Sequence, residues 1–571
     1  MAVLIVLGRR PGGAWQVPDS PGSSTPALPP ELVASEERSS SGMVASADPQ
    51  ASRAGAVILE RGGNAVDAAV ATAFALGVVD PTCAGLGGQA LALVHLADGR
   101  EVAVDGSAPV PVNVVPRELL RLKDSERLFG YPVSATPSML ATMTHLLRRF
   151  GTVSLAQALQ PAIELAERGH TLRPYVRADL EMEIAKVMED DYLAGLFLRD
   201  RRGVWPDGCM LQQPVLAATM RRIAAGGEAS FRQGRIAAEI EADMLAGGGY
   251  VRRGDLAAVK VVEREPVRGR YRAVEVVSFP DPGGGNVLVG ALQILEAFPP
   301  DLLRQDSANR LHLLVEAVRI AMIDNALARH PQQPDPDYGR RRARLIRFDR
   351  ALEDREILAS RVRWVAAGGT TQISVMDRWG NAVAMTETLG TSGFVASPTL
   401  GFQYNSLLDS FDLANPASPR YPAPMRVART SMAPTLLLQA GAPLVVLGGA
   451  GSSRIPSSML LVISNLVDRG LSLGQAISSP RVVVDPPKGT RVLLELAGAI
   501  TSAQADSLQA RGFANQFRLT FPPRQVDLCA FGGVNAVMVE PGGMLVGVGD
   551  PRRQGGAAAP SPPAAVRASA H

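Results

Sequence analysis

Cysteine and histidine are scarce in this chain, with 3 and 6 copies among 571 residues. The cysteines, Cys83, Cys209 and Cys529, are odd in number, lie far apart and form no CxxC pair. This spacing argues against a disulfide framework and against a zinc–thiolate site. No two histidines lie four residues apart, so the HExxH pattern of metalloproteases is missing too. We expect neither a metal site nor a cofactor.

The chain also lacks a strong charge of either sign and a long hydrophobic run. Its 58 Lys and Arg residues are balanced by 55 Asp and Glu residues, which leaves a net charge of +3. So weak a field favours neither nucleic acid nor an anionic membrane. The apolar run from Met1 to Gly8 is followed by Arg9 and Arg10, which reverses the charge order of a secretory signal, and it is too short to span a bilayer. We expect a cytoplasmic protein.

Proline, glycine and other small residues are concentrated at the two ends. Residues 11–41 are rich in Pro, Ser and Gly, and residues 554–571 are rich in Ala, Pro and Gly. Such compositions are typical of disorder. We therefore predict disordered segments at 1–41 and 554–571, with the folded part between them.

Helical and strand-like patterns share the folded part. Capping residues and apolar spacing predict helices, among them 51–61, 65–76, 155–168, 236–245 and 311–328. Runs of β-branched residues predict strands at 273–279, 372–377, 382–388, 435–438 and 443–447. Helices together with antiparallel hairpins favour a layered α+β fold.

Three glycine clusters invite comparison with phosphate-binding loops, at 85–88, 283–285 and 448–453. None has the GK[ST] ending of a P-loop or full GxGxxG spacing, so nucleotide binding is disfavoured. The first two are interpreted as tight turns. The third follows a strand-like run, and its consecutive backbone N–H groups can form an anion nest or oxyanion hole.

The most informative region is a predicted hairpin whose first strand begins with two threonines after two glycines. It runs from Gly368-Gly369-Thr370-Thr371 to Asp377, turns, and returns along residues 382–388. By itself this pattern is weak, because Thr is common in strands and Gly-Gly in turns.

In wider context, the chain resembles the gamma-glutamyltransferase family of N-terminal-nucleophile hydrolases. The matching motifs occur in the same order as in the family and span nearly the whole sequence between residues 42 and 550. They are Gly42-Met43-Val44-Ala45, Gly63-Asn64-Ala65-Val66-Asp67-Ala68-Ala69, Gly85-Leu86-Gly87-Gly88, the Thr370 hairpin, Ser431-Met432-Ala433-Pro434-Thr435 and Gly451 to Arg454. The resemblance implies a four-layer αββα sandwich.

The resemblance also implies that the precursor cuts its own Gly369–Thr370 bond. The products would be a large chain, residues 42–369, and a small chain, residues 370–553, which stay together as partners. A small residue before the cut permits a strained backbone, and the Thr370 hydroxyl can attack the preceding carbonyl. Cleavage frees an α-amine whose reference pKa, about 7.7 to 8.0, suits a general base beside the hydroxyl that it activates.

Other catalytic roles follow from the same resemblance. Thr388 matches the second family threonine, whose hydroxyl orients the nucleophile. Gly451 and Ser452 match the two-glycine oxyanion hole, where a backbone N–H of Ser452 still serves as a donor. The catalytic half of the site is therefore expected to be intact.

The residues that would recognise glutamate differ from the family pattern. In the family, an arginine pairs with the substrate α-carboxylate. The corresponding motif here, Asp105-Gly106-Ser107-Ala108-Pro109, is shorter and lacks this arginine. Thr430 and Ser431 keep the hydroxyl pair that supports this carboxylate. The side chains that hold the α-amino group are replaced by neutral residues, Gly390, Leu407 and Ser410. A clamp without its cation and its carboxylate cannot offset the desolvation of a zwitterionic head, unless another arginine replaces the missing one.

We therefore predict a self-processing N-terminal-threonine hydrolase or acyltransferase that acts on a small acyl compound other than glutathione. Two alternatives stay open. One is a carbon–carbon bond hydrolase of alkylproline-type natural-product biosynthesis, as in divergent relatives of this family. The other is an unprocessed, non-catalytic family member, against which the retention of Thr370, Thr388 and the Gly451 loop argues.

Overall fold

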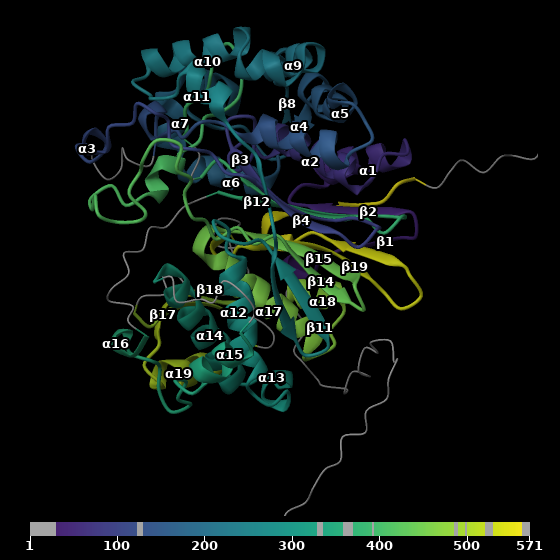
Figure 1. Cartoon of the computed structure of the whole chain (residues 1–571), viewed down its shortest axis with the longest axis vertical. Coiled ribbons are helices and arrows are strands. Elements are labelled where there is room, and N and C mark those ends of the chain that lie inside the picture. The colour runs from purple at the N-terminus through teal and green to yellow at the C-terminus, as the bar shows by residue number, and fades with distance from the viewer. Residues whose placement is uncertain are drawn as a thin grey trace, which may run out of the picture.

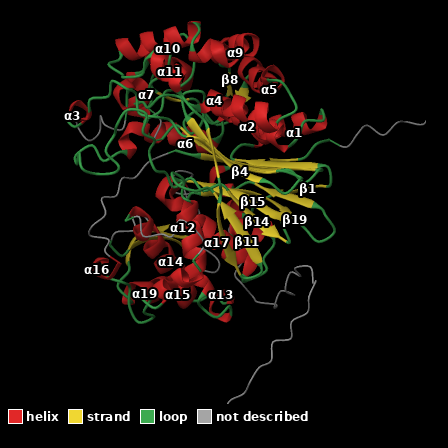
Figure 2. Cartoon of the chain, viewed as in Figure 1, coloured by secondary structure: helices red, strands yellow, loops and turns green. Residues whose placement is uncertain are grey.

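Two stacked β-sheets form the centre of the molecule, and helices cover the outer face of each (Figures 1 and 2). The structure is a computed structural model that describes residues 30–122, 129–327, 335–357, 369–390, 393–484, 489–496, 500–519 and 529–561. Each main sheet has seven strands, and every pairing within them is antiparallel.

The first sheet, called here the hairpin sheet, has the strand order β21-β2-β12-β13-β3-β4-β9. Its strands in that order are Gly556–Ala558, Gly42–Ser46, Thr371–Asp377, Ala382–Thr388, Gln89–His95, Glu101–Gly106 and Val262–Arg264. The predicted threonine hairpin is thus β12–β13, near the middle of the sheet. Its turn is held by Asp377, whose Oδ1 accepts hydrogen bonds from the backbone N–H groups of Trp379, at 2.8 Å, and Asn381, at 3.0 Å.

The second sheet has the strand order β1-β20-β19-β15-β14-β11-β10. Its strands in that order are Glu36–Ser39, Leu545–Val548, Gly533–Val539, Ala442–Ala450, Thr435–Gln439, Val274–Ser278 and Val267–Tyr271. Three smaller sheets are β5–β8 (His170–Thr171 and Met210–Leu211), β6–β7 (Leu198–Arg199 and Gly203–Val204) and β16–β17–β18 (Val482–Val484, Arg491–Glu495 and Ala514–Leu519).

Helices from the first half of the chain pack on the hairpin sheet in one apolar cluster. They are α1 (Pro49–Glu60), α2 (Ala65–Val79), α4 (Met139–Phe150), α5 (Leu155–Arg168), α9 (Pro214–Arg232) and α10 (Arg235–Ala246). The caps expected from the sequence start them: the Asp48 carboxylate accepts from Gln50 N at 2.7 Å, and Asn64 and Ser154 form capping boxes. Every residue of α2 is buried, which places this helix between layers.

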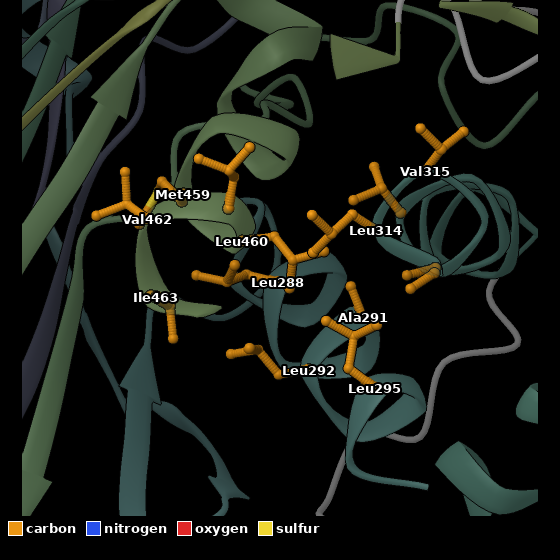
Figure 3. Packing of buried hydrophobic residues seen from close by; sticks show 14 of the residues in the cluster. Leu288, Ala291, Leu292, Leu295, Leu314, Val315, Met459, Leu460, Val462 and Ile463 are labelled. Carbon is orange, nitrogen blue, oxygen red and sulfur yellow. The ribbon is translucent and has the colours of Figure 1, made fainter. Parts of the chain in front are cut away.

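A second group of helices covers the second sheet. They are α12 (Gly285–Glu296), α14 (Ala308–Ala326), α15 (Pro336–Ala343), α17 (Ile455–Val467), α18 (Leu473–Ser478) and α19 (Ser502–Ala510). In Figure 3, Leu288 and Leu292 of α12 lie against Leu460 of α17, with Leu314 of α14 beside them. The remaining short helices are α3 (Pro116–Leu119), α6 (Pro174–Met182), α7 (Ile184–Glu189), α8 (Asp191–Phe197), α11 (Arg253–Ala258), α13 (Asp301–Arg304) and α16 (Asp354–Ile357).

The alternation of side chains between the two faces of each strand explains the four layers. In β2, Met43 and Ala45 belong to the apolar cluster between the sheets, whereas Val44 belongs to the cluster under the helices. In β15, Val446 faces the other sheet and Val445 faces the helices. Because successive side chains of a strand point to opposite faces, apolar residues at every position fit a strand that is covered on both sides. The predicted four-layer αββα arrangement is confirmed.

The prediction of disorder is wrong near both ends of the chain. Residues 36–39 form β1, which pairs with β20, and residues 556–558 form β21, which pairs with β2. The partners of these edge strands lie hundreds of residues away in sequence, so local composition carries no sign of them. Residues 1–29 and 562–571 lie outside the described residues. Among the helices that the structure describes, none combines the length and apolar character needed to cross a membrane.

Candidate active site

Thr370 and Thr388 lie side by side at one end of the β12–β13 hairpin. Thr371 pairs with Glu387 across the hairpin, and this register sets the residue before Thr371 opposite the residue after Glu387. The Thr370 hydroxyl donates to the Thr388 hydroxyl over 3.4 Å, the Thr388 hydroxyl donates to the Gly369 carbonyl oxygen, and Gly390 N donates to Thr388 Oγ1 over 2.8 Å. Both threonine side chains are buried. A continuous hydrogen-bonded chain therefore joins the Thr370 hydroxyl to the carbonyl that precedes it.

The backbone on both sides of the Gly369–Thr370 bond is tightly held. A Cβ added to Gly369 would lie 3.1 Å from Cys83 Sγ and 3.1 Å from the Thr82 carbonyl oxygen, which is too close for an ordinary contact. On the other side, the buried Arg553 donates from Nη1 to the Thr370 carbonyl oxygen over 2.8 Å. Sequence reasoning missed Arg553, which lies 183 positions from Thr370. A side chain at position 369 would therefore crowd Cys83 and the Thr82 carbonyl oxygen.

One pocket gathers most of the residues proposed from the sequence. Thr370 and Thr388 form part of its wall. The other predicted residues that line it are Gly390, Leu407, Ser410, Thr430, Ser431 and Ser452. Further lining residues were not foreseen: Gln89, Val287, Met322, Asn325, Ala326, Arg420, Ala428, Arg429, Ser453, Ile455 and Pro456. Gly451 and Gly369 adjoin the pocket in sequence without lining it. The hairpin sheet, the loop after β15, helices α12, α14 and α17 and the segment 407–431 therefore contribute to a single site.

The loop proposed as an oxyanion hole joins β15 to α17. Gly451 has a φ of +117°, and its Cβ would lie only 2.8 Å from the Cα of Gly532, so glycine is needed there. Ser452 also has a positive φ, +61°, which is uncommon for a residue with a side chain. Ser453, Ile455 and Pro456 bring the N-terminal end of α17 to the pocket wall. Helix N-termini favour negative charge, so an oxyanion is electrostatically suited to this wall.

Three pocket positions correspond to those that hold the substrate α-amino group in the resembled family. The residues at these positions carry no charge. Gly390 has a φ of +80°, and its Cβ would lie 2.7 Å from Ser406 Oγ. Leu407 is buried in an apolar cluster with Ala108 and Phe411. None of the described residues that line the pocket is acidic. The described residues that line this wall offer no negatively charged partner for an ammonium group.

None of the residues 105–109 lines the pocket. Asp105 uses Oδ1 to accept from Ser107 and Oδ2 to accept from Arg264 Nε, at 2.8 Å. Its carboxylate therefore organises the end of β4. No residue of this motif supplies the cation that the family places here.

Two arginines from a different segment line the pocket instead, and sequence reasoning missed both. Arg420 donates from Nη2 to the Ser410 carbonyl oxygen over 3.0 Å, and desolvation by burial lowers its pKa. Arg429 pairs through Nε with Asp281 Oδ1 at 2.7 Å. No motif marks either position. The missing cation of the family motif was the only signal in the sequence that pointed to an arginine from another segment.

A cluster of buried ionisable groups lies behind the Gly369–Thr370 bond. Burial raises the pKa of Asp80, the residue that ends α2, to about 7, and one of its carboxylate oxygens has no hydrogen-bond partner. Burial also raises the pKa of Glu387 and of Cys83 well above their usual ranges. The carbonyl oxygen of Asp80 accepts from Cys83 N at 3.1 Å, and Cys83 contacts Gly369. Among the described residues, no group of three Asp, Glu, His or Cys side chains is arranged to hold a metal ion.

Comparison with known proteins places this site in a family. A family model described as gamma-glutamyltranspeptidase matches residues 51–560. The "Acylase ACY 1 proenzyme" of Pseudomonas sp. (strain V22) is 36% identical over 530 residues, covering 89% of this chain and 91% of that protein. The "Glutathione hydrolase proenzyme" of Escherichia coli (strain K12) is 31% identical, covering 93% of this chain and 94% of that protein.

A solved structure agrees with these sequence relatives. The cephalosporin acylase from Bacillus halodurans superposes with a TM-score of 0.80 at 25% identity, covering 95% of this chain and 99% of the other. The predicted family, the N-terminal-nucleophile hydrolase fold and the enzyme class are therefore confirmed. The family model matches most of the chain, and the acylase and glutathione hydrolase relatives align with nearly all of it. The chain therefore belongs to the gamma-glutamyltranspeptidase family.

Proposed function

We propose that the protein is a self-processing N-terminal-threonine amide hydrolase whose acyl substrate lacks the zwitterionic γ-glutamyl head. The observation that carries this proposal is the hydrogen-bonded chain from the Thr370 hydroxyl through Thr388 to the Gly369 carbonyl oxygen, at the wall of a pocket without acidic side chains. The acylase relative and the cephalosporin acylase structure support an acyl substrate of this wider class.

Maturation begins with attack of Thr370 Oγ1 on the Gly369 carbonyl carbon. The Thr388 hydroxyl already donates to the Gly369 carbonyl oxygen and would stabilise the negative charge that develops there. The Gly369–Thr370 C–N bond breaks, the Thr370 nitrogen takes up the hydroxyl proton, and an ester joins Gly369 to Thr370 Oγ1. Water then hydrolyses the ester, leaving a carboxylate on Gly369 and a free α-amine on Thr370.

Turnover repeats this chemistry on an external amide. The Thr370 α-amine takes the proton from its own hydroxyl, and Oγ1 attacks the substrate carbonyl. Backbone N–H groups of the Gly451–Ser452 loop and the N-terminus of α17 stabilise the oxyanion. The leaving amine departs with the proton, and water hydrolyses the acyl ester to release the acid and restore Thr370.

The pocket lining favours an aliphatic acyl chain. Val287, Met322, Leu407 and Ile455 supply apolar surface on several sides of the site. The family's glutathione hydrolases act on a charged γ-glutamyl head, whose ammonium finds no acidic partner here. We therefore place the substrate among acyl amides that carry no ammonium next to the head carboxylate.

Self-cleavage is tested by following the purified precursor on a denaturing gel and sequencing the N-terminus of the smaller fragment. The proposal requires two fragments that end at Gly369 and begin at Thr370, and complete loss of cleavage in Thr370→Ala. Thr371→Ala is the matched control, because Thr371 Oγ1 is buried without a hydrogen-bond partner and does not line the pocket. A single uncleaved band for the wild type, inactive on acyl p-nitroanilides, would support the non-catalytic alternative.

A further inference from the structure

A buried arginine from near the end of the chain lies beside the nucleophile. Arg553 ends the 3₁₀ turn Pro551–Arg553 and donates from Nη1 to the Thr370 carbonyl oxygen over 2.8 Å. A Cβ added to Gly451 would lie 3.6 Å from its other terminal nitrogen, Nη2. The guanidinium therefore adjoins both the residue that carries the nucleophile and the loop proposed as the oxyanion hole.

The surrounding chain fixes the position of this side chain. A Cβ added to Gly533 would lie 2.8 Å from Arg553 Cδ, so the aliphatic part of the arginine packs directly on that backbone. The guanidinium lies over the ring of Tyr175, 5.4 Å from its centroid, and Tyr175 N donates to Gln554 Oε1 over 3.0 Å. Arg553 N donates to the Asp550 carbonyl oxygen over 3.2 Å. The positive charge is thus held in place before a substrate arrives.

The ionisable side chains that the structure places around Arg553 favour their neutral forms. They are Asp80 and Cys83 at the end of α2, and Tyr175 and Asp179 on α6. Burial raises the pKa of all four, and the charge of Arg553 opposes that rise. Two further buried carboxyls, Glu387 and Asp48, interact with Asp80, and burial raises their pKa as well. Burial therefore weakens the negative charge that could neutralise the guanidinium.

This positive charge also lies close to the nitrogen that becomes the α-amine. Within one residue the nitrogen and the carbonyl oxygen are at most about 3.7 Å apart, so Thr370 N lies within about 6.5 Å of Arg553 Nη1. A cation at such a distance disfavours protonation of an amine. An α-amine with a pKa of about 8 is only about one-tenth unprotonated at pH 7, whereas one with a pKa of about 7 is half unprotonated.

From this arrangement we infer that Arg553 is a positioning residue for the general base: it fixes the Thr370 backbone and, through its charge, keeps the Thr370 α-amine unprotonated at neutral pH. The inference rests on the proposed function, since only self-cleavage frees this amine, and it adds what prepares the amine to take the proton from Oγ1. Asp80 acts in the opposite sense, because its negative charge, once ionised, favours the protonated amine. Removing Arg553 and removing Asp80 should therefore shift the pKa of the amine in opposite directions.

The pH dependence of kcat/KM tests the inference with mature enzyme and an acyl p-nitroanilide, because its acid limb reports the base of the free enzyme. Arg553→Met should raise the pKa of this limb by about one unit, which lowers kcat/KM about tenfold at pH 6 and leaves it within about threefold of wild type at pH 9. Arg553→Lys keeps a cation and should restore most of the activity at pH 6. Asp80→Asn should lower the pKa of the limb.

Arg222→Met is the matched control for the loss of one arginine. Arg222 pairs with Glu239 between α9 and α10, and Glu239 keeps a second partner in Arg235. Its acid limb should stay at the wild-type position. A loss that is equal at every pH in Arg553→Met would indicate a merely structural role and would overturn the inference. If Arg553→Met fails to fold or to cleave itself, Asp80→Asn still decides, because an unmoved or raised limb in that variant would contradict the inference.

Competitive acetylation of the amine separates this inference from the proposed function. Cleaved protein is treated with acetic anhydride between pH 5 and pH 10, and mass spectrometry measures the acetylated fraction of the peptide that begins at Thr370. We expect the midpoint in Arg553→Met to lie about one pH unit above that of wild type. Such a shift would uphold the inference even if the cleaved protein hydrolysed no anilide. Equal midpoints in an active enzyme would reject the inference alone, and a wild-type chain that never cleaves would reject both.

Discussion

The hydroxyl of Thr388 donates a hydrogen bond to the carbonyl oxygen of Gly369, the residue whose peptide bond to Thr370 is the proposed cleavage site. Thr388 also accepts from the Thr370 hydroxyl and from Gly390 N. It thus contacts both the nucleophile and the atom on which negative charge develops. This position supports a role in maturation in addition to the orienting role expected from the family.

Removing the Thr388 hydroxyl should slow both self-cleavage and turnover. We expect Thr388→Ala to reduce the rate of precursor cleavage on the order of 100-fold, the usual effect of losing one donor to a developing oxyanion. Thr388→Ser keeps the hydroxyl and should restore most of the rate. A time course of fragment appearance on a denaturing gel measures the cleavage rate, and wild-type kinetics in Thr388→Ala would remove the residue from the mechanism.

Adding a single methyl group at position 369 should hinder cleavage for a steric reason. In Gly369→Ala the new Cβ lies 3.1 Å from Cys83 Sγ and from the Thr82 carbonyl oxygen, so the backbone at 369 or these neighbours must shift. We expect cleavage to slow at least tenfold, in line with the sensitivity of reaction rates to small displacements. Gly254→Ala, where a Cβ meets nothing within 4 Å, serves as the control.

A second variant separates crowding by Cys83 from crowding by the Thr82 carbonyl oxygen. Cys83→Ala removes the sulfur that the new methyl group meets and should recover part of the rate in combination with Gly369→Ala. No recovery would indicate that the Thr82 carbonyl oxygen, which lies equally close to the new Cβ, is enough to hinder cleavage.

Stability should fall as the pH rises through the range in which Asp80 titrates. Burial raises the pKa of Asp80 to about 7 in the folded protein, well above its usual value of about 3.9. Arg553 and the Cys83 side chain oppose this shift, whereas Asp179 and Asp48 add to it. Between about pH 4 and pH 7 the folded state keeps a proton that the unfolded state has released. The free energy of unfolding therefore decreases with pH in this window, by up to about 1.4 kcal/mol per pH unit from this group.

Urea unfolding of wild type and Asp80→Asn between pH 4 and pH 8 isolates this contribution. The amide does not titrate, so the variant should show a flatter dependence of stability on pH in the window. Asp200→Asn changes a side chain that is 83% exposed and should leave the slope unchanged. Parallel curves for wild type and Asp80→Asn would contradict the assignment of a raised pKa to Asp80.

γ-Glutamyl compounds should be poor substrates even when maturation is complete. Glutathione and γ-glutamyl-p-nitroanilide carry an ammonium for which Gly390, Leu407 and Ser410 offer no negative charge. A site that leaves a polar group unpaired discriminates by factors of about 10⁴. Ser410→Asp adds a carboxylate at the pocket wall and should raise kcat/KM for γ-glutamyl-p-nitroanilide relative to wild type. If the mature protein hydrolysed glutathione at rates ordinary for the family, this prediction would be wrong and the protein would be specific for γ-glutamyl compounds.

Local features of this protein were predictable because their causes lie within a few residues. Asp48, Asn64 and Ser154 start helices by bonding to N–H groups two or three positions ahead. The β12–β13 hairpin follows from two strand-forming runs and a turn held by Asp377. The register of such a hairpin brings residues 370 and 388 together without help from the rest of the chain.

The recognition half of the site was decided by tertiary structure. Gln89 arrives on a strand of the hairpin sheet, Asn325 on helix α14, and Arg420 and Arg429 on the segment before β14. No spacing rule relates residues so far apart in sequence. The same holds for Arg553 at the Thr370 carbonyl and for the edge strands β1 and β21, whose short sequences contain no sign of their partners. From the sequence by itself, periodicity and caps indicated a layered α+β fold and one hairpin, and the resemblance of its motifs to a known family indicated the family, the four layers and the roles of the two threonines. Only the folded chain determined which charges face the substrate, because packing distant segments together sets which guanidinium groups line the pocket and which carboxylates remain outside it.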